Sequence, residues 1–386
     1  MSLEDALNDV ATASLPYSER PHVTITGNTG ESVTGLTETT LISDDESLLR
    51  YSGLDPEEWE VVSRDNIMWL KEKQYANKRS IKFTFRRRTQ YTRELHDWLT
   101  TVFTPPAPHV DEMTATGDPI VICLADMQIG KAQERLGGTP ELINRFHNIL
   151  GQLTDYVAAE EPRHLVIADL GDICENTSNH TSVSQVSTND ITFAEQLQVA
   201  QRLLGEAIEA LAPYAGHTTI VGVDSNHMQE RLANGQQNAH GDFGVQNILM
   251  LKNFYDRLDQ DGMLGLNLEW KVPGPLDSGV FLTVEGLPLA FTHGHDAGSP
   301  NKMAQWLANQ AALPGSPYAT ARVLIHGHFH HFQSTITRHR RILGVPALES
   351  GSGWVKRRNG EESDPGVVTF RIHNKKYSSE RTFEEL

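Results

Sequence analysis

The stretch LVIADLGDICEN, residues 165–176, joins an apolar run directly to a polar turn. The apolar part, residues 165–168, has the length and composition of a buried strand. Similar segments recur on both sides of it, with strands expected at 120–125 and 218–223 and amphipathic helices at 142–159 and 193–211. Strands that alternate with helices indicate βαβ units and a largely parallel sheet. The middle of the chain is therefore predicted to have an α/β fold.

The pattern after residue 270 is richer in strands. Residues 280–284 and 287–292 flank Glu285-Gly286, a pair typical of a hairpin turn. Further strands are expected at 323–326, 334–338, 342–345 and 367–372. We expect these segments to form a second sheet that packs against the first one.

Length and composition exclude several classes of protein. The 386 residues suffice for about two domains, and a hydrophobic content of 38% suffices for a sizeable core. Lys and Arg number 33 against 50 Asp and Glu, and the formal charge of −17 disfavours a general binder of nucleic acid or membrane surfaces. Only Cys123 and Cys174 are present, which excludes a disulfide framework. No apolar run approaches the roughly 18 residues that span a bilayer, and the acidic N-terminus lacks secretory features, so we expect a cytoplasmic protein without membrane partners.

Charge is distributed unevenly along the chain, and the change in charge and composition near residue 103 indicates a domain boundary. Residues 1–63 carry thirteen acidic and two basic side chains, whereas residues 64–93 carry ten basic and two acidic ones. The Pro-rich sequence TPPAP begins at Thr104 and is typical of a stiff spacer. We predict a small α+β accessory domain at 1–103, a linker at 104–117, the main domain at 118–375 and a C-terminal tail at 376–386.

The basic stretch is the main sequence clue to a substrate. Ile81, Phe83 and Phe85 alternate with polar residues, which predicts a half-buried strand. Basic side chains interleaved with aromatic ones suit phosphate contacts and base stacking, and the candidates for nucleic-acid contact are Lys82, Arg86, Arg87 and Arg88. The alternative is that these side chains form surface ion pairs with the acidic first 63 residues.

Polar side chains with metal-binding chemistry follow five of the expected strands. They fall in the segments 126–128, 171–176, 224–227, 293–296 and 326–331. In α/β sheets, ligands bind in the crevice beyond the carboxyl ends of the strands. These five segments span more than 200 residues of sequence, yet we expect them to converge on one site.

The residue types in these segments indicate a divalent cation rather than a structural zinc knot. Carboxylates, amide oxygens and imidazoles suit hard or borderline cations, and cysteine is absent from the expected ligand positions. A His-x-His pair on an extended segment places both imidazoles on one face, which suits His328 and His330. Asp172 has two oxygens with which to bridge two cations, an arrangement that supports in-line displacement at phosphorus.

The order Asp-x-Gln, Gly-Asp-x-x-Glu, Asn-His, His-Gly-His, Gly-His-x-His resembles the calcineurin-like metallophosphoesterase superfamily over residues 119–370. The resemblance implies a four-layer αββα sandwich of two mixed sheets with two divalent ions between them. It implies that one ion is held by Asp126, Gln128, Asp172 and His330, and the other by Asp172, Asn226, His293 and His328. It also implies that His227 stabilises the scissile phosphate and protonates the leaving oxygen. Manganese is the ion it most favours, with zinc, iron, nickel or magnesium as alternatives.

The sequence departs from the family pattern at three positions. Gln128 replaces a usual histidine, Ser225 replaces a glycine, and Met228 replaces the acid that orients the catalytic histidine. An amide oxygen is a weaker ligand than imidazole and favours manganese or magnesium. Asp224 or Glu230 is expected to take over the orienting role. The Asp-x-Gln variant with its acidic front end resembles members associated with tailed bacteriophages.

Several neighbouring polar residues are expected to support the ligands rather than to bind an ion. They are Asp169, Glu175, Asp224 and His295. Asp169 precedes the second motif by three residues and is expected either to orient a ligand or to cap the turn.

The sequence thus predicts a phosphoester hydrolase, with a phosphodiesterase or nuclease for DNA or RNA as the leading hypothesis. In that hypothesis a metal-bridging hydroxide attacks phosphorus and His227 assists the leaving oxygen. One alternative is a phosphomonoesterase for a nucleotide, a phosphoprotein or a small phosphate. The other is a non-catalytic binding module that keeps the metal cage.

Overall fold

The computed structural model divides the chain into two compact units, residues 1–101 and 102–386, which we describe separately. It describes residues 22–28, 32–39, 45–52, 54–56, 59–68, 79–87, 95, 97–100, 115–132, 136–176, 189–232, 235–236, 239–349, 351 and 364–384. The predicted linker, 104–117, therefore lies outside the described residues as far as residue 114.

The first unit contains a four-stranded antiparallel sheet and a helix. Its elements are β1 (His22–Asn28), β2 (Ser32–Thr39), α2 (Asp45–Tyr51), β3 (Trp59–Met68) and β4 (Arg79–Arg87), and the strand order is β1-β2-β4-β3. Phe83 and Phe85 are buried in one cluster with Leu48 and Leu49 of α2, so the predicted strand and the burial of these two residues are confirmed. Of the candidate nucleic-acid contacts, Arg88 lies outside the described residues, as do the side chains of Lys82, Arg86 and Arg87.

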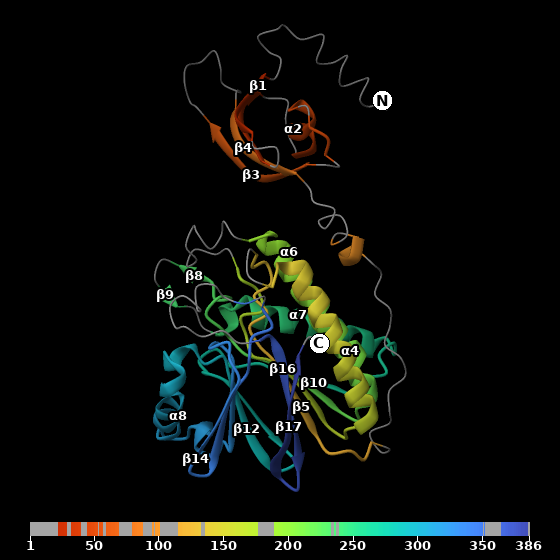
Figure 1. Ribbon diagram of the computed structural model, residues 1–386, viewed down its shortest axis with the longest axis vertical. Helices are drawn as coiled ribbons and strands as arrows, with labels where there is room; N and C mark the ends of the chain where they lie inside the picture. Colours follow the sequence, from red (N-terminus) through yellow and green to blue (C-terminus); the bar gives the residue numbers. More distant parts are fainter. Residues whose placement is uncertain are drawn as a thin grey trace. The chain divides into compact units, whose positions relative to one another are not determined.

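The second unit contains two mixed sheets (Figure 1). The six-stranded sheet has the order β10 (Leu268–Lys271), β7 (Thr218–Gly222), β6 (Leu165–Asp169), β5 (Ile120–Leu124), β16 (Gly366–His373) and β17 (Lys376–Glu384). Its first four strands are parallel, and β16 and β17 are antiparallel to their neighbours. The predicted parallel βαβ core is therefore confirmed.

The five-stranded sheet has the order β11 (Val280–Val284), β12 (Leu287–Thr292), β13 (Val323–His326), β15 (Arg340–Gly344) and β14 (Gln333–Thr337). Strands β12, β13 and β15 are parallel, and the hairpin β11–β12 is antiparallel, as its Glu285-Gly286 turn predicts. The polar segments therefore follow the carboxyl ends of β5, β6 and β7 in the six-stranded sheet and of β12 and β13 in the five-stranded sheet.

The burial pattern of the strands shows how the layers stack. Val121 of β5 packs with Phe291 of β12 and Ile325 of β13 in one core cluster between the two sheets. Residues of the opposite face of β5, such as Ile122, line a small cavity with Phe146 of α4 (Thr139–Glu160). Alternate residues of a strand thus face two different layers, as the two-residue period of a strand requires.

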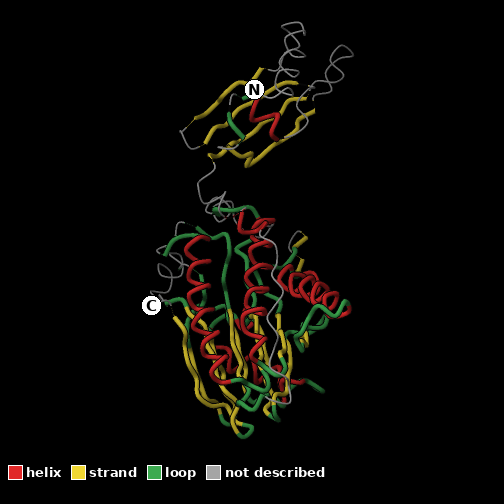
Figure 2. The backbone as a smooth tube through the Cα atoms, turned by 90° about the vertical axis from the view of Figure 1, so that its right-hand side faces the viewer, coloured by secondary structure: helices red, strands yellow, loops and turns green. Residues whose placement is uncertain are grey.

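Helices cover the outer faces of both sheets, with α8 on one side and α4 on the other (Figure 1), and Figure 2 looks onto the helices of the six-stranded sheet. Besides α4, the six-stranded sheet carries α6 (Phe193–Leu211) and α7 (Phe243–Gln260), and α4 contacts α6, which contacts α7. Leu324 of the five-stranded sheet packs against Leu307 of α8 (Met303–Ala311) on its other face. The predicted four-layer αββα fold is therefore confirmed.

Short elements connect these layers. They are the hairpin β8 (Arg231–Leu232) and β9 (Gly235–Gln236) and the 3₁₀ turns Ala212–Tyr214, Ala239–Gly241, His295–Ala297, Pro300–Lys302 and Pro317–Ala319. None of the helices in the described parts of the chain combines the length and the apolar character that crossing a membrane demands.

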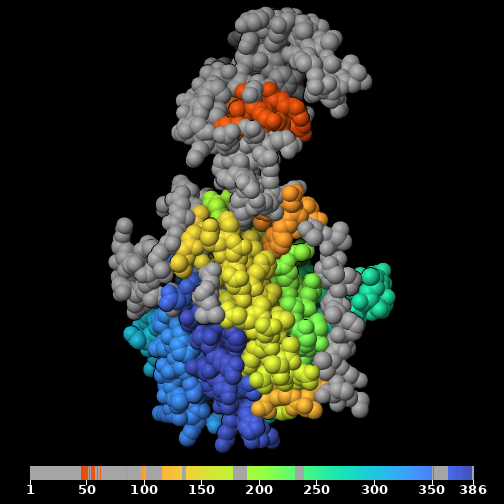
Figure 3. Space-filling view, turned by 45° about the vertical axis from the view of Figure 1, so that its right-hand side comes forward, coloured from red at the N-terminus to blue at the C-terminus, as the bar shows by residue number. Residues whose placement is uncertain are grey.

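The C-terminal segment corrects one prediction. Residues 376–384 form β17 and complete the six-stranded sheet, so they are part of the domain rather than a tail. Tyr377 stacks on Phe370 with ring centroids 4.5 Å apart, and Phe383 lies 5.5 Å from Tyr156 of α4. Figure 3 shows α4 beside the C-terminal strands on this face of the molecule. The strand was overlooked because charged residues interrupt its apolar alternation.

Candidate metal centre

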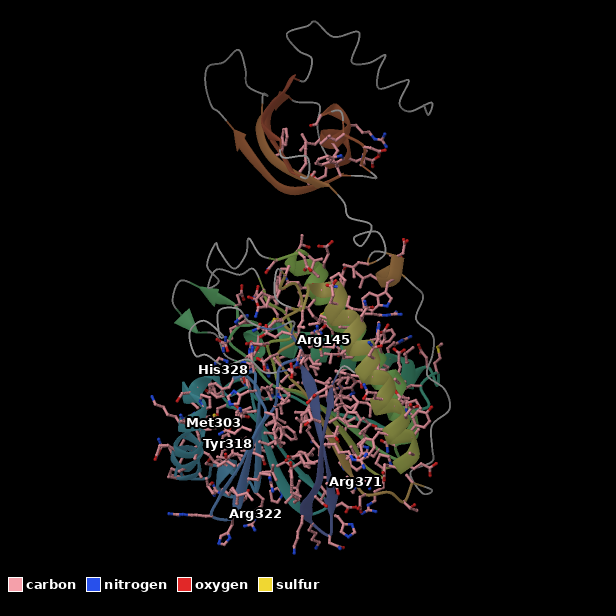
Figure 4. The ribbon with its side chains drawn as sticks, in the orientation of Figure 1. Arg145, Met303, Tyr318, Arg322, His328 and Arg371 are labelled. Carbon is pink, nitrogen blue, oxygen red and sulfur yellow. The ribbon has the colours of Figure 1, made fainter. Side chains whose placement is uncertain are left out.

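The five polar segments meet at one end of the two sheets. Asp126 follows β5, Asp172 follows β6, Asn226 follows β7, His293 follows β12 and His328 follows β13. Figure 4 shows His328 near this end, whereas Arg322, which precedes the same strand β13, lies at the opposite end. The site therefore occupies the crevice beyond the carboxyl ends of the strands.

The turns that carry the candidate ligands have left-handed backbone conformations. The angle φ is +47° at Asp126, +44° at Gln128, +50° at Asp172, +70° at His328 and +59° at His330. Each such non-glycine residue costs roughly 1–2 kcal/mol, so the surrounding structure must enforce it. Backbone hydrogen bonds do so, because the Asp126 N–H donates to Gly171 O at 3.1 Å and the Gln128 N–H donates to Asp172 O at 2.9 Å. Several strained residues at one site are typical of a functional centre.

His293 Nε2 lies close to three other atoms that could act as metal ligands. The His293 Nδ1–H donates to the carbonyl oxygen of Leu170 at 2.8 Å, which directs Nε2 toward the side chains that follow the other strands. Nε2 lies 3.0 Å from Asp172 Oδ2, 3.0 Å from Asn226 Oδ1 and 3.2 Å from His328 Nδ1. One ring nitrogen thus faces two oxygens and a second ring nitrogen in a buried place, and in the metal-free protein it shares a proton with the Asp172 carboxylate.

This arrangement requires a positive charge. Burial opposes protonation of His293, but the Asp172 carboxylate outweighs it and raises the pKa of the imidazole to about 9. The ligand atoms of Asp172, His293 and His328 lie within 4.8 Å of one another and could hold a metal ion. Carboxylate, amide and imidazole donors suit a borderline divalent cation, so the residues fit a metal site. We call Asp172, Asn226, His293 and His328 the His293 site.

The remaining predicted ligands, Asp126, Gln128 and His330, follow β5 and β13. Asp126 Oδ2 accepts the backbone N–H of His328 at 2.8 Å, and its Oδ1 lies 3.2 Å from His330 Nε2. Among the described residues, that buried Oδ1 accepts no well-formed hydrogen bond. We call Asp126, Gln128, Asp172 and His330, the ligand set that the resemblance implies, the Gln128 site, and the buried oxygens of Asp126 also suit a cation.

Two residues beside the Gln128 site were missed by sequence reasoning. Glu349, after β15, pairs with His330 Nδ1 and with the ammonium of Lys131. Lys131 also donates to Gln128 Oε1 at 2.9 Å. The position of Lys131 three residues after Gln128 was a signal that could have been used, but Glu349 lies 218 residues from Lys131 and has no recognisable motif around it.

His227 projects beside the His293 site and is held by two acids. Its backbone N–H donates to Asp172 Oδ1 at 2.8 Å, and its Nδ1–H donates to the carbonyl oxygen of Glu175 at 3.1 Å. The Glu175 carboxylate lies 3.5 Å from the same Nδ1. Burial lowers the pKa of the imidazole, but Asp172 and Glu175 together raise it to about 9. The His227 imidazole is therefore protonated at neutral pH in the metal-free protein.

Glu175, rather than Asp224 or Glu230, occupies the orienting position beside His227. Met228, at the place of the usual acid, is fully buried. Glu230 is exposed, and its backbone N–H bonds to Gly241. No described hydrogen bond joins Asp224 to His227, although burial raises the pKa of the Asp224 carboxyl.

Asp169 and His295, the other predicted supporting residues, lie near the His293 site but contact different groups. Asp169 Oδ1 accepts the backbone N–H of Gly171 at 3.0 Å, so this carboxyl caps the turn before Asp172. Burial raises the pKa of Asp169 to about 7. The ring of His295 lies 5.5 Å from that of His293, between centroids, and its Nε2 lies 3.5 Å from Asp296 Oδ1.

The turns that carry Asp172 and Asn226 are packed tightly, and a glycine substitution tests this. Gly171 has φ +90°, and a Cβ there would lie 2.6 Å from Ser225 Cβ. We expect Gly171→Ala to lower the free energy of unfolding by about 2–4 kcal/mol. Gly151, in the middle of α4, has open space around its Cβ position, so Gly151→Ala should raise it by about 0.5–1 kcal/mol. Urea unfolding of both variants measures the two changes, and equal changes would contradict the packing.

Comparisons with known proteins give only distant likenesses. No protein-family description matches the sequence, and no curated protein matches it. Among solved structures, a novel archaeal phosphodiesterase is similar at 12% identity and a TM-score of 0.34, over 68% of this chain and 99% of that one. A predicted phosphoesterase from Streptococcus pneumoniae has 10% identity and a TM-score of 0.30, over 70% and 100%. Vps29 from Chaetomium thermophilum has 8% identity and a TM-score of 0.32, over 70% of this chain and 100% of that one.

Proposed function

We propose that this protein is a metal-dependent phosphoester hydrolase of the calcineurin-like metallophosphoesterase superfamily. The observation that carries the proposal is the His293 site, where a ring nitrogen of His293, two oxygens and a second ring nitrogen converge in a buried place. A protonatable histidine held by a buried acid lies directly beside it. Cation ligands next to a proton donor are the parts that hydrolysis of a phosphate ester requires.

In this proposal, one group of residues binds cations and the pair of His227 and Glu175 supplies a proton. The His293 site would hold one divalent cation and the Gln128 site a second, with Asp172 shared between them. When bound, such a pair activates water and offsets the charge that develops on the phosphoryl oxygens. His227 carries the proton that the leaving oxygen needs, and Glu175 keeps the imidazole oriented and charged. The Asp172 side chain connects the cation ligands to His227. Its Oδ1 accepts the His227 backbone N–H, and its Oδ2 lies 3.0 Å from His293 Nε2.

Within this class, we propose a phosphodiester of DNA or RNA as the substrate and manganese as the cation. The support for nucleic acid is the basic stretch 64–93 of the first unit, and the support for manganese is the amide ligand Gln128 in place of an imidazole. We also retain a cytoplasmic location as part of the proposal.

The decisive experiment compares three substrates with and without metal. The protein, stripped with EDTA and then given Mn²⁺, should hydrolyse bis-p-nitrophenyl phosphate and single-stranded DNA faster than p-nitrophenyl phosphate. Mn²⁺ should also raise the melting temperature, because it binds only the folded state. Faster release from p-nitrophenyl phosphate would establish a monoesterase instead. Absence of hydrolysis of every ester with Mn²⁺, Zn²⁺, Fe²⁺, Ni²⁺ and Mg²⁺ would refute the proposed phosphoesterase activity.

The role of the basic stretch is tested by replacing Arg86, Arg87 and Arg88 together with alanine. We expect DNA cleavage to fall about tenfold or more at low salt, because phosphate contacts are lost, while hydrolysis of bis-p-nitrophenyl phosphate stays unchanged. The salt dependence of DNA cleavage should also become shallower. Equal loss with both substrates would show that the stretch acts on folding rather than on substrate binding.

A further inference from the structure

The segment Asp172–Asn176, which follows β6, holds His227 at three polar atoms. Asp172 Oδ1 accepts the His227 backbone N–H at 2.8 Å, and the carbonyl oxygen of Glu175 accepts the ring Nδ1–H at 3.1 Å. The third contact is to the other side of the backbone, where the side-chain amide of Asn176 donates to the carbonyl oxygen of His227. Because these contacts fix the backbone and one ring nitrogen of His227, they also fix where the second ring nitrogen, Nε2, points.

Asn176 is fully buried, and both polar groups of its backbone are bonded. Its N–H donates to Gln196 Oε1 at 2.9 Å, and its carbonyl oxygen accepts from Asn189 Nδ2 at 3.0 Å. Its φ is +70°, in the left-handed region that asparagine adopts more readily than most residues do. The backbone of Asn176 is therefore held in one conformation, and in that conformation its amide reaches the carbonyl oxygen of His227.

Gln196 connects this contact to α6. It is fully buried, and its Nε2 donates to the carbonyl oxygen of Ile191 at 3.3 Å. Its side chain also packs on Gly130, which has φ +99° and where a Cβ would lie 2.4 Å from Gln196 Cδ. Gln196 thus connects the turn at Gly130 to Asn176, and Asn176 continues the connection to His227. Because a buried amide that loses its hydrogen bonds is costly, this chain of contacts resists displacement of any one member.

From these contacts we propose that Asn176 is a positioning residue for His227: it holds the His227 carbonyl oxygen and thereby keeps the imidazole where it can give its proton to the leaving oxygen. The inference rests on the proposed function. The role differs from that of Glu175, because Glu175 contacts the ring whereas Asn176 contacts the backbone. A displacement of the imidazole by about 1 Å is enough to slow a chemical step about 100-fold.

The test uses Asn176→Gly and Asn176→Asp in the full chain with Mn²⁺. Both residues tolerate a left-handed backbone, and neither provides the amide donor. We expect kcat for bis-p-nitrophenyl phosphate to fall about 10- to 100-fold in both variants, while KM and the Mn²⁺ dissociation constant stay within about twofold of the wild type. In a His227→Gln background, neither change should lower the rate further, because the amide acts only through His227.

Hydrogen exchange in the metal-free protein gives a readout that does not depend on activity. The His227 amide should exchange about tenfold faster or more in Asn176→Gly, because the turn opens more easily once its carbonyl oxygen is released. The matched control is Asn374, an exposed asparagine with φ +50° in the turn between β16 and β17. Asn374→Gly should change neither this exchange rate nor kcat.

The outcomes separate the inference from the proposed function. Unchanged kcat in both Asn176 variants, or an equal further loss in the His227→Gln background, would overturn the inference and leave the proposed function intact. Absence of hydrolysis by the wild type with every metal would refute the proposed function and with it the catalytic role of Asn176. The exchange rate of the His227 amide would still decide whether Asn176 holds that residue in place.

Discussion

The Asp172→Asn variant is expected to hydrolyse phosphate esters at least about 1,000-fold more slowly than the wild type. Among the residues that the structure describes, Asp172 is the one carboxylate that touches both His293 and the His227 backbone, at 3.0 and 2.8 Å. Asparagine preserves its shape but removes the charge that attracts a cation and keeps His227 protonated. Initial rates with bis-p-nitrophenyl phosphate and Mn²⁺, together with the Mn²⁺ dissociation constant, measure both losses.

An exposed aspartate of the same domain provides the control. Asp155 lies on the outer surface of α4, so Asp155→Asn should change neither the rate nor the affinity for Mn²⁺. The metal-free Asp172→Asn protein should remain folded, because a buried carboxylate without a cation is costly and its neutral isostere is not. Full activity of Asp172→Asn would show that the chemistry takes place elsewhere on the molecule.

The second large effect is expected at the pair of His227 and Glu175. His227→Gln should lower the rate of hydrolysis by about 100- to 10,000-fold, because the leaving oxygen loses its proton donor. Glu175→Gln should lower it by about 10- to 100-fold, since the imidazole keeps a neutral partner but loses the charge 3.5 Å away. The double variant should be no slower than His227→Gln alone, because Glu175 acts through His227.

A measurement independent of activity distinguishes this role from a purely structural one. In the metal-free protein, the Glu175 carboxylate is one of the groups that raise the pKa of His227 to about 9. Glu175→Gln should therefore lower that pKa, and an NMR titration of the His227 ring measures the change. The exposed Glu230, the other acid near this turn, is the matched control: Glu230→Gln should alter neither the pKa nor the rate. An unchanged pKa in Glu175→Gln would remove Glu175 from the mechanism.

Much of the fold could be predicted because its signals are local. The apolar runs that became β5, β6 and β7 are short and continuous, as buried parallel strands are, and α4 and α6 show a clear helical period. β17 was missed because charged residues interrupt its alternation, and its place in the sheet depends on pairing with β16. Such pairing is a tertiary property that a single strand does not reveal.

The sequence by itself determined which chemical groups stand at the ends of the strands, because each motif is a short run directly after an apolar segment. Only the tertiary structure decided how those groups pair. It placed Glu175 rather than Asp224 or Glu230 beside His227, and it brought Lys131 and Glu349 together across 218 residues. The physical reason is that side-chain periodicity specifies only which face of a strand is buried. The contacts between side chains at the ends of different strands depend on how the two sheets pack, and on the left-handed turns that follow the strands.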